Sequence, residues 1–395
     1  MKILFLFIAT LFFFTFPGLS QEKEKNYTLC GYIKDMQTVI MGDPKENWIT
    51  DNLIHNRMNF NWYPNDNLAL NIELRTRFIW GEMISMESMV PDSLLLFKYS
   101  DFIDRQTGYV NASGNILKEK SFILHSSLER FCLTWTKGKF RVDIGRQRIN
   151  WGQSFVWNPN DIFNAYSFFD FDYEEKPGSD AVRLQYYSGA ASQAEIAVKA
   201  DHNEKITAAC LFRFNKWNYD IQFLGGILAE EDIVAGAGWS GQLLKGGFMG
   251  EATWFQPVDN IKDTVGVIAI SAGYNYTFKN SLFLQFEALY NSNGRTDSSF
   301  NLQEFYYTDL SARNLSLNRF SVFGMMSYPV SPLLTAGFSI MYSPNDKSLY
   351  LGPTAGISLA DNFDLQLSAQ AFLSDNSALE GGKGAFVFVR FRHSF

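Results

Sequence analysis

The charged and amide residues that could do chemistry are concentrated between positions 141 and 183. Arginines and carboxylates stand there among tryptophan and phenylalanine side chains. Opposed acids and bases across a narrow, wet passage create a transverse field that selects solutes by size and charge. The same groups could instead form a plug that only fixes a loop. We predict a charged pore constriction, with the plug as the alternative, and its residues are Arg141, Asp143, Arg146, Gln147, Arg148, Asp161, Asp170, Asp172, Glu174, Glu175, Asp180 and Arg183.

Sequence signals for an enzyme are thin. None of the four histidines has zinc-ligand spacing to another His or Cys, and no G-x-S-x-G segment is present. Gly236, Gly238 and Gly241 fit the pattern G-x-G-x-x-G, but no helix is expected after them, so we interpret them as small residues of a strand. We expect no enzyme activity, cofactor or metal. A hydrolase with a dispersed triad stays an alternative, for which His125 and Ser126 are the pair to inspect.

Polar and apolar residues alternate along most of the chain, as they do in strands with two different faces. In segment 281–291, Leu284 and Phe286 alternate with Gln285 and Glu287. After the first twenty residues, no stretch is long and apolar enough for a transmembrane helix. The alternating segments exceed the usual strands of a sandwich and reach the about 9–11 residues that a tilted membrane strand needs.

These segments predict an all-β fold, a transmembrane antiparallel up-and-down β-barrel of about 18 strands, with 16 as the alternative. Long and short connections alternate, as they do between the outer and periplasmic ends of such a barrel. The predicted strands are 28–39, 51–62, 67–81, 121–136, 139–149, 179–188, 192–200, 205–215, 217–229, 232–242, 246–256, 264–278, 281–291, 315–328, 331–343, 348–359, 362–373 and 384–395.

Both ends of the chain fit export to an outer membrane. Residues 1–20 have a lysine, an apolar core and small residues before a polar segment, which predicts a cleaved signal peptide. Residues 21–27 would form a short periplasmic segment, and 28–395 the barrel. The final strand ends at Phe395 with apolar residues at alternate positions before it. This ending resembles the assembly signal of outer-membrane barrels, which implies recognition by the barrel-assembly machinery.

Three short motifs in 145–183 resemble a known group of barrels. They are G-R-Q-x-x-x-W-G from Gly145, N-P-x-D from Asn158 and P-G-x-D-x-x-R from Pro177. Together they resemble porin-like barrels of the alginate-export type and related uncharacterised outer-membrane proteins. The resemblance implies a transport barrel, without implying alginate as its solute.

The long connection 150–178 is expected to fold into the lumen, because its aromatic residues should not stand in water. Its acids would then face basic residues of the inner wall, namely Arg57, Arg75, Arg77 and Arg183. Glu73 shares the polar face of strand 67–81 with two of these arginines. We predict that these wall residues line the constriction.

The sequence therefore predicts an integral outer-membrane channel of a Gram-negative bacterium, for passive or substrate-selective diffusion of small polar or charged solutes. Its expected partners are membrane lipid, the assembly machinery and a small polar solute or oligosaccharide. A net charge of −7 argues against nucleic acid. An adhesin or structural barrel acting through its outer loops stays an alternative. Neither the oligomeric state nor the direction of transport follows from the sequence.

Overall fold

The computed structural model describes residues 26–41, 48–89, 99–104, 108–165, 168, 175–259, 261–296, 311–374 and 383–395. The predicted signal peptide and Asp170, Asp172 and Glu174 lie outside these described residues. None of the helices in the described part is long and apolar enough to cross a membrane.

Nineteen antiparallel strands and two short helices make up the described structure. The helices are α2 (Glu82–Met89) and α3 (Tyr99–Ile103). The strands are β1 (Tyr27–Met41), β2 (Ile49–Asn65), β3 (Leu68–Gly81), β4 (Ser113–Lys118), β5 (Phe122–Lys137), β6 (Phe140–Gln147), β7 (Ser179–Gly189), β8 (Ser192–Ala200), β9 (Ile206–Lys216), β10 (Tyr219–Leu228), β11 (Asp232–Leu243), β12 (Gly246–Pro257), β13 (Val267–Thr277), β14 (Phe283–Asn291), β15 (Phe320–Ser331), β16 (Leu334–Ser343), β17 (Ser348–Ala360), β18 (Phe363–Leu373) and β19 (Lys383–Ser394).

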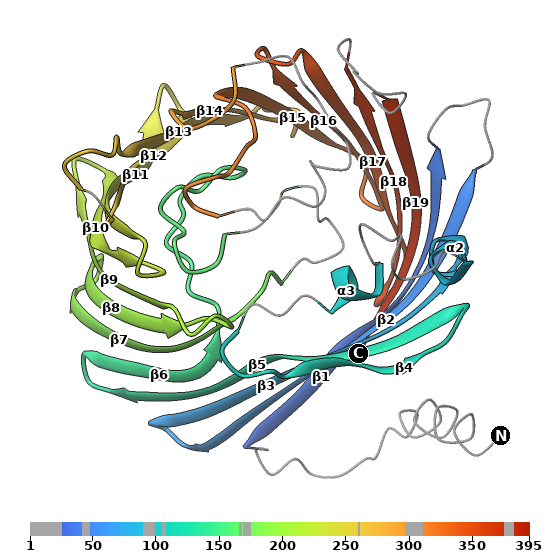
Figure 1. Cartoon of the computed structure of the whole chain (residues 1–395), viewed down its shortest axis with the longest axis horizontal. Coiled ribbons are helices and arrows are strands. Elements are labelled where there is room, and N and C mark those ends of the chain that lie inside the picture. The colour runs from blue at the N-terminus through green and yellow to red at the C-terminus, as the bar shows by residue number, and fades with distance from the viewer. Residues whose placement is uncertain are drawn as a thin grey trace.

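Eighteen of these strands close into a barrel, because β19 pairs with β1 as well as with β18. Figure 1 shows the resulting ring. All 18 predicted strands are confirmed, and the alternative of 16 is wrong. The sequence missed β4, which pairs with Ile123–Ser127 of β5. One edge of this part of β5 pairs with β3. The other edge is open to β4, because β6 pairs only with Phe131–Lys137 of β5.

The predicted alternation of long and short connections is confirmed. At one end of the barrel the strands are joined by tight turns, such as Trp217-Asn218 between β9 and β10. Both turn residues have positive φ, 57° and 61°, as a two-residue hairpin turn of matching twist requires. All the long connections lie at the other end, including 148–178 between β6 and β7.

Each strand presents one polar and one apolar face, and the barrel turns the polar face inward. In β14, Gln285 and Glu287 are buried inside, while Phe286 is 57% exposed on the outside. An apolar exterior around a polar interior is the arrangement that spans an outer membrane. A closed ring also leaves no strand edge unpaired in lipid.

Two buried apolar clusters lie inside the ring, where the connection 148–178 meets the wall. Trp151 and Phe163 pack against one group of wall residues, and Val156 and Trp157 against another. The green segment inside the ring of strands in Figure 1 is this connection. The expectation that it folds into the lumen is therefore met by the described residues 148–165 and 175–178.

Candidate functional site

The carboxylate of Glu287 on β14 holds the inserted loop by its backbone. It accepts hydrogen bonds from the amides of Phe155 at 3.0 Å, Val156 at 3.0 Å and Trp157 at 2.7 Å. Glu287 is 3% exposed. Three consecutive amides converging on one buried charge replace the water that the loop lost on entering the lumen.

Glu251 on β12 binds the loop in the same way, on either side of residues 155–157. Its carboxylate accepts from the amides of Gln153, of Ser154 at 2.9 Å and of Asn160 at 2.8 Å. A third wall acid, Glu195 on β8, accepts from the indole Nε1 of Trp151 at 2.5 Å. The inner wall thus supplies the negative charge, and the loop supplies the donors.

Asn160 fixes the tip of the loop against β11. Its Nδ2 donates to the carbonyl oxygen of Ala237 at 3.1 Å, and its Oδ1 accepts from the Thr253 hydroxyl at 2.7 Å. A Cβ added to Gly236 would lie 2.5 Å from Asn160 Oδ1, and one added to Gly238 would lie 2.9 Å from its Nδ2. The first two glycines of the G-x-G-x-x-G pattern, Gly236 and Gly238, therefore make room for Asn160.

One predicted pair of loop acid and wall base is present. Glu175 lies 3.5 Å from Arg57 and accepts a 2.7 Å hydrogen bond from the Tyr32 hydroxyl. Burial alone would raise the pKa of Glu175, but the Tyr32 bond and the Arg57 charge hold it below its usual value. Arg57 also contacts Glu73 on the neighbouring strand.

Asp161, another predicted loop acid, is 1% exposed and faces different bases from those expected. Burial raises the pKa of its carboxyl to about 7, although the charges of Arg148 and Lys199 act against this rise. Lys199 donates to the Phe163 carbonyl oxygen at 2.6 Å. Asp161 therefore lies next to Asn160 at the loop tip, where the nearby basic groups are Arg148 and Lys199.

The described contacts of three wall arginines are with groups other than the loop acids. Arg75 pairs with Glu129 of the wall at 2.8 Å, and Arg183 with Glu195 at 2.7 Å. Arg77 donates to the carbonyl oxygen of Ile103 in α3 at 2.5 Å. Wall acids thus pair with Arg75 and Arg183, while the expected contacts with Asp170, Asp172 and Glu174 lie outside the described residues.

The remaining predicted residues of β6 and β7 divide between the two faces of the wall. Asp143 and Gln147 are buried inside, and Arg141 pairs with Asp143 at 2.9 Å. Arg146 and Asp180 alternate with these buried positions and point to the opposite face. They pair at 2.7 Å and bind the backbone of Val110, so they do not line the lumen.

Basic side chains gather on one sector of the inner wall. Cross-strand register brings Arg392, Lys34, His55 and Arg77 into one row across β19, β1, β2 and β3. The guanidinium of Arg392 lies 4.3 Å from the Tyr32 ring centre, and the Lys34 ammonium 4.9 Å. Arg57 and Arg75 form a second row two residues nearer the short-turn end. The sequence prediction missed Arg392, Lys34 and His55. The alternation of polar and apolar residues in β1, β2 and β19 could have placed all three on the inner face.

The barrel is similar in fold to outer-membrane protein OprD from Pseudomonas aeruginosa. The TM-score is 0.57 at 8% identity, and 94% of each chain is covered. OccAB4 from Acinetobacter baumannii gives 0.57 at 11% identity, covering 94% of this chain and 99% of that one. P. aeruginosa OpdK, solved with vanillate, gives 0.54 at 8%, covering 93% and 99%. No protein-family model matches the sequence, and a search of curated proteins gives no match.

The pair that a hydrolase would use does not converge in this barrel. His125 faces the lumen, where its ring contacts Asp104 at 3.1 Å, while Ser126 points outward to Thr76. Asp104 also accepts from the Ser113 hydroxyl at 2.6 Å. The acid therefore lies between the serine and the histidine, whereas a catalytic triad needs the histidine between the serine and the acid. Within the described residues, no group of three or more His, Cys, Asp or Glu side chains is placed to hold a metal.

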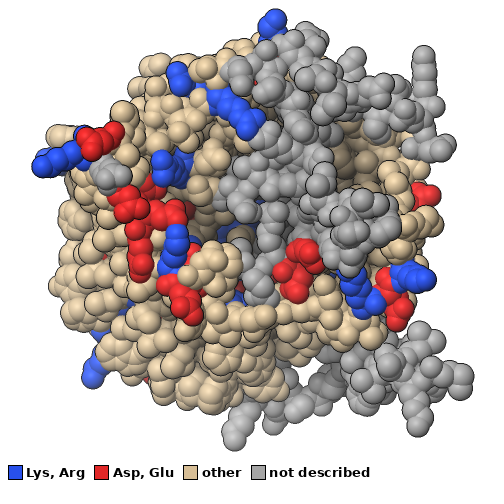
Figure 2. Space-filling model, in the orientation of Figure 1, with Lys and Arg blue, Asp and Glu red and all other residues tan. Residues whose placement is uncertain are grey.

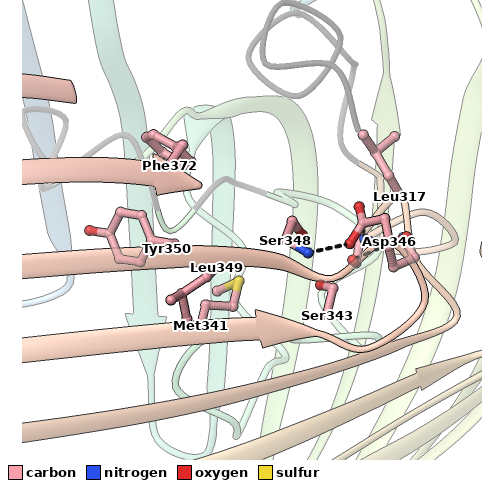
Figure 3. A pocket seen from close by; sticks show the side chains of 10 residues that line it. Leu317, Met341, Ser343, Asp346, Ser348, Leu349, Tyr350 and Phe372 are labelled. Carbon is pink, nitrogen blue, oxygen red and sulfur yellow. Dashed lines mark hydrogen bonds between the residues drawn. The ribbon is translucent and has the colours of Figure 1, made fainter. Parts of the chain in front are cut away.

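A small pocket lies at the long-loop end of β16 and β17 (Figure 3). Three of its lining residues, Met341, Tyr350 and Phe372, share an apolar cluster with the inserted loop. Its acid, Asp346, accepts from the Ser348 amide at 2.9 Å and from Asn318 Nδ2 at 2.7 Å. The carboxylate therefore caps the β16–β17 turn.

Replacing Glu287 by Gln should loosen the loop. The side-chain amide leaves only one acceptor atom for three amides, and each charge-assisted bond contributes roughly 1.5–3 kcal/mol. We expect hydrogen exchange of residues 155–157 to accelerate by about tenfold or more, since about 1.4 kcal/mol corresponds to tenfold. The control is Glu231→Gln at the exposed rim, which should leave exchange in the loop unchanged. Equal exchange in the two variants would contradict the clamp.

Gly236→Ala should disturb the loop tip from the wall side. The new methyl group would meet Asn160 Oδ1, a buried atom already bonded to Thr253, so Asn160 has to move. We expect faster exchange of the Asn160 amide in mass-spectrometric measurements. Gly225→Ala on β10 is the matched control, because its Cβ would meet only a carbonyl oxygen at 3.7 Å. The idea fails when both alanines behave alike.

Proposed function

We propose that this protein is an outer-membrane channel for passive or substrate-selective diffusion of small polar or charged solutes. The observation that carries the proposal is the loop 148–178, held inside the lumen by Glu251 and Glu287. About 18 strands enclose an aqueous lumen unless loops narrow it. A fixed loop converts such a lumen into a constriction.

The basic sector opposite these carboxylates supports a preference for negatively charged solutes. Arg392, Lys34 and Arg77 share one row around the inner wall, and the acids on β8, β12 and β14 are already bonded to the loop or to Arg183. In Figure 2 the barrel face is hollowed near its middle, with Lys and Arg atoms deep inside. OpdK was solved with vanillate, and a small carboxylate of that kind fits such a sector.

The same proposal includes export of the chain and its insertion into the outer membrane. A signal peptide over residues 1–20 would direct export, and the strand ending at Phe395 would be recognised by the barrel-assembly machinery. Phe395 exchanges backbone hydrogen bonds of 2.9 and 3.0 Å with Gly31 of β1, so this residue also completes the closure. The motifs of segment 145–183 support a relation to alginate-export-type porins, while the solute is left open.

The channel is tested by single-channel recording of refolded protein in planar bilayers. We expect stable conductance that rises with salt, and larger, noisier steps for Glu287→Gln, because the loosened loop no longer holds one position. A protein that folds but conducts nothing over a range of salts and solutes would exclude the channel and favour a plugged structural barrel.

The basic sector predicts anion preference. Reversal potentials under a potassium chloride gradient should favour chloride, and Lys34→Gln with Arg392→Gln should lower the anion-to-cation permeability ratio several-fold. The loss of two charges in a low-dielectric wall acts strongly on a passing ion. Lys205→Gln with Lys262→Gln removes the same charge from exposed outer loops and should change the ratio little. Cation preference in the wild type would refute the assignment.

A further inference from the structure

The lipid-facing surface of the barrel is interrupted by a polar stripe on one sector. Alternation places Asp35 and Gln37 on the outside of β1, because Tyr32, Lys34 and Met36 are buried inside. The same reasoning puts other outward polar residues on the next strands. The stripe consists of Asp35, Gln37, Asn52, Asn56, Thr76 and Ser126.

Cross-strand register shows that these residues are neighbours. Asn56, Thr76 and Ser126 stand side by side in one row across β2, β3 and β5. Gln37 pairs with Asn52 two outward rows away, and the row between them holds Asp35 beside Ile54 and Phe78. The stripe therefore consists of two polar rows on either side of the row that holds Asp35, across four adjacent strands of the barrel.

Asp35 lies near the middle of its strand and not at a membrane interface. It follows Tyr27 by eight positions and precedes Met41 by six. Its register partners, Phe391 and Ile54, are apolar. Charged side chains on the lipid face of a barrel are destabilising, most of all at the bilayer midplane.

The described outer faces of strands β13 to β18 differ from this sector. From β13 to β18, the described outward positions carry apolar side chains, tyrosines or glycine; in β18 they are Phe363, Leu365, Leu367, Ala369, Ala371 and Leu373. The ionisable pair Arg146 and Asp180 also turns outward, but it lies at the long-loop ends of β6 and β7, where the backbone of Val110 bonds to both side chains. The stripe at Asp35 differs because its carboxylate is exposed and its recorded hydrogen bond comes from Gln37 at 3.2 Å.

We propose that this stripe is the interface with a second copy of the chain, packed about a twofold axis along the membrane normal. Its chemistry is self-complementary, since the amides of Gln37, Asn52 and Asn56 donate as well as accept and can satisfy the partner copy's Asp35 carboxylate. Side-chain amides and carboxylates join transmembrane elements in this way, because unpaired polar groups are unfavourable in hydrocarbon. A twofold axis brings the same surface of both copies together.

The proposal depends on the proposed function only in that the barrel spans a membrane, and its test needs no conductance. Cys30, Cys132 and Cys210 are replaced by Ala, and Gln37→Cys is added. Oxidation in native outer membranes should link two chains through this position. Phe223→Cys on β10, an outward residue on the far side of the ring in Figure 1, is the matched control and should stay monomeric.

A second variant removes the polar chemistry. Asp35→Leu with Asn56→Leu should reduce cross-linking at Gln37→Cys by roughly tenfold, while heat-modifiable migration shows that the barrel still folds. A monomer in every case, or a cross-linked product containing a different protein, overturns the twofold interface. Cross-linking in a protein that does not conduct would exclude the proposed channel and leave this inference standing.

Discussion

A backbone segment can cross the inside of a barrel only when its amides find acceptors. Hairpins and strands satisfy their amides by pairing, but residues 153–160 pair with no strand. Glu251 and Glu287 solve this problem, because each collects three amides on one carboxylate. These two acids thus hold residues 153–157 and Asn160 against the wall.

The same contacts separate acidic from basic side chains around the inner wall. Acids on β12 and β14 are turned toward the loop, and Glu195 on β8 is shared between Trp151 and Arg183. The opposite sector, on β19, β1, β2 and β3, keeps basic groups such as Arg392 in rows along the wall. Insertion of the loop therefore narrows the passage and also leaves positive charge on its far side.

Much of the fold could be predicted because period-two alternation is a local property. Gln285 and Glu287 already indicate which face of β14 is polar, and the alternation of loop lengths gives the direction of every strand. The addition of β4 could not be predicted this way, since its short segment has no clear alternation. Its place depends on the edge of β5 left free where β6 ends.

The candidate site was harder to predict because it depends on which residues meet across the lumen. The sequence identifies Arg75 and Arg183 as inward-facing, but it does not show that Glu129 and Glu195 lie beside them on the wall. Those nearer acids neutralise both arginines before a loop acid can. Among the described residues of the loop, Glu175 near its end reaches Arg57, one of the predicted arginines.

Whether a polar residue of a barrel stabilises the chain or needs a further partner depends on the face on which it lies. Asn160 is fully buried, yet both ends of its amide are bonded to the wall, so it adds to the stability of the loop. Asn56, of the same chemistry, points toward the membrane, where water does not compete for hydrogen bonds. Glycine at positions 236 and 238 makes room for Asn160, whereas the proposed twofold partner would cover Asn56 and Asp35. A surface of this kind is stable in lipid when a second surface covers it, and a twofold copy supplies the matching chemistry.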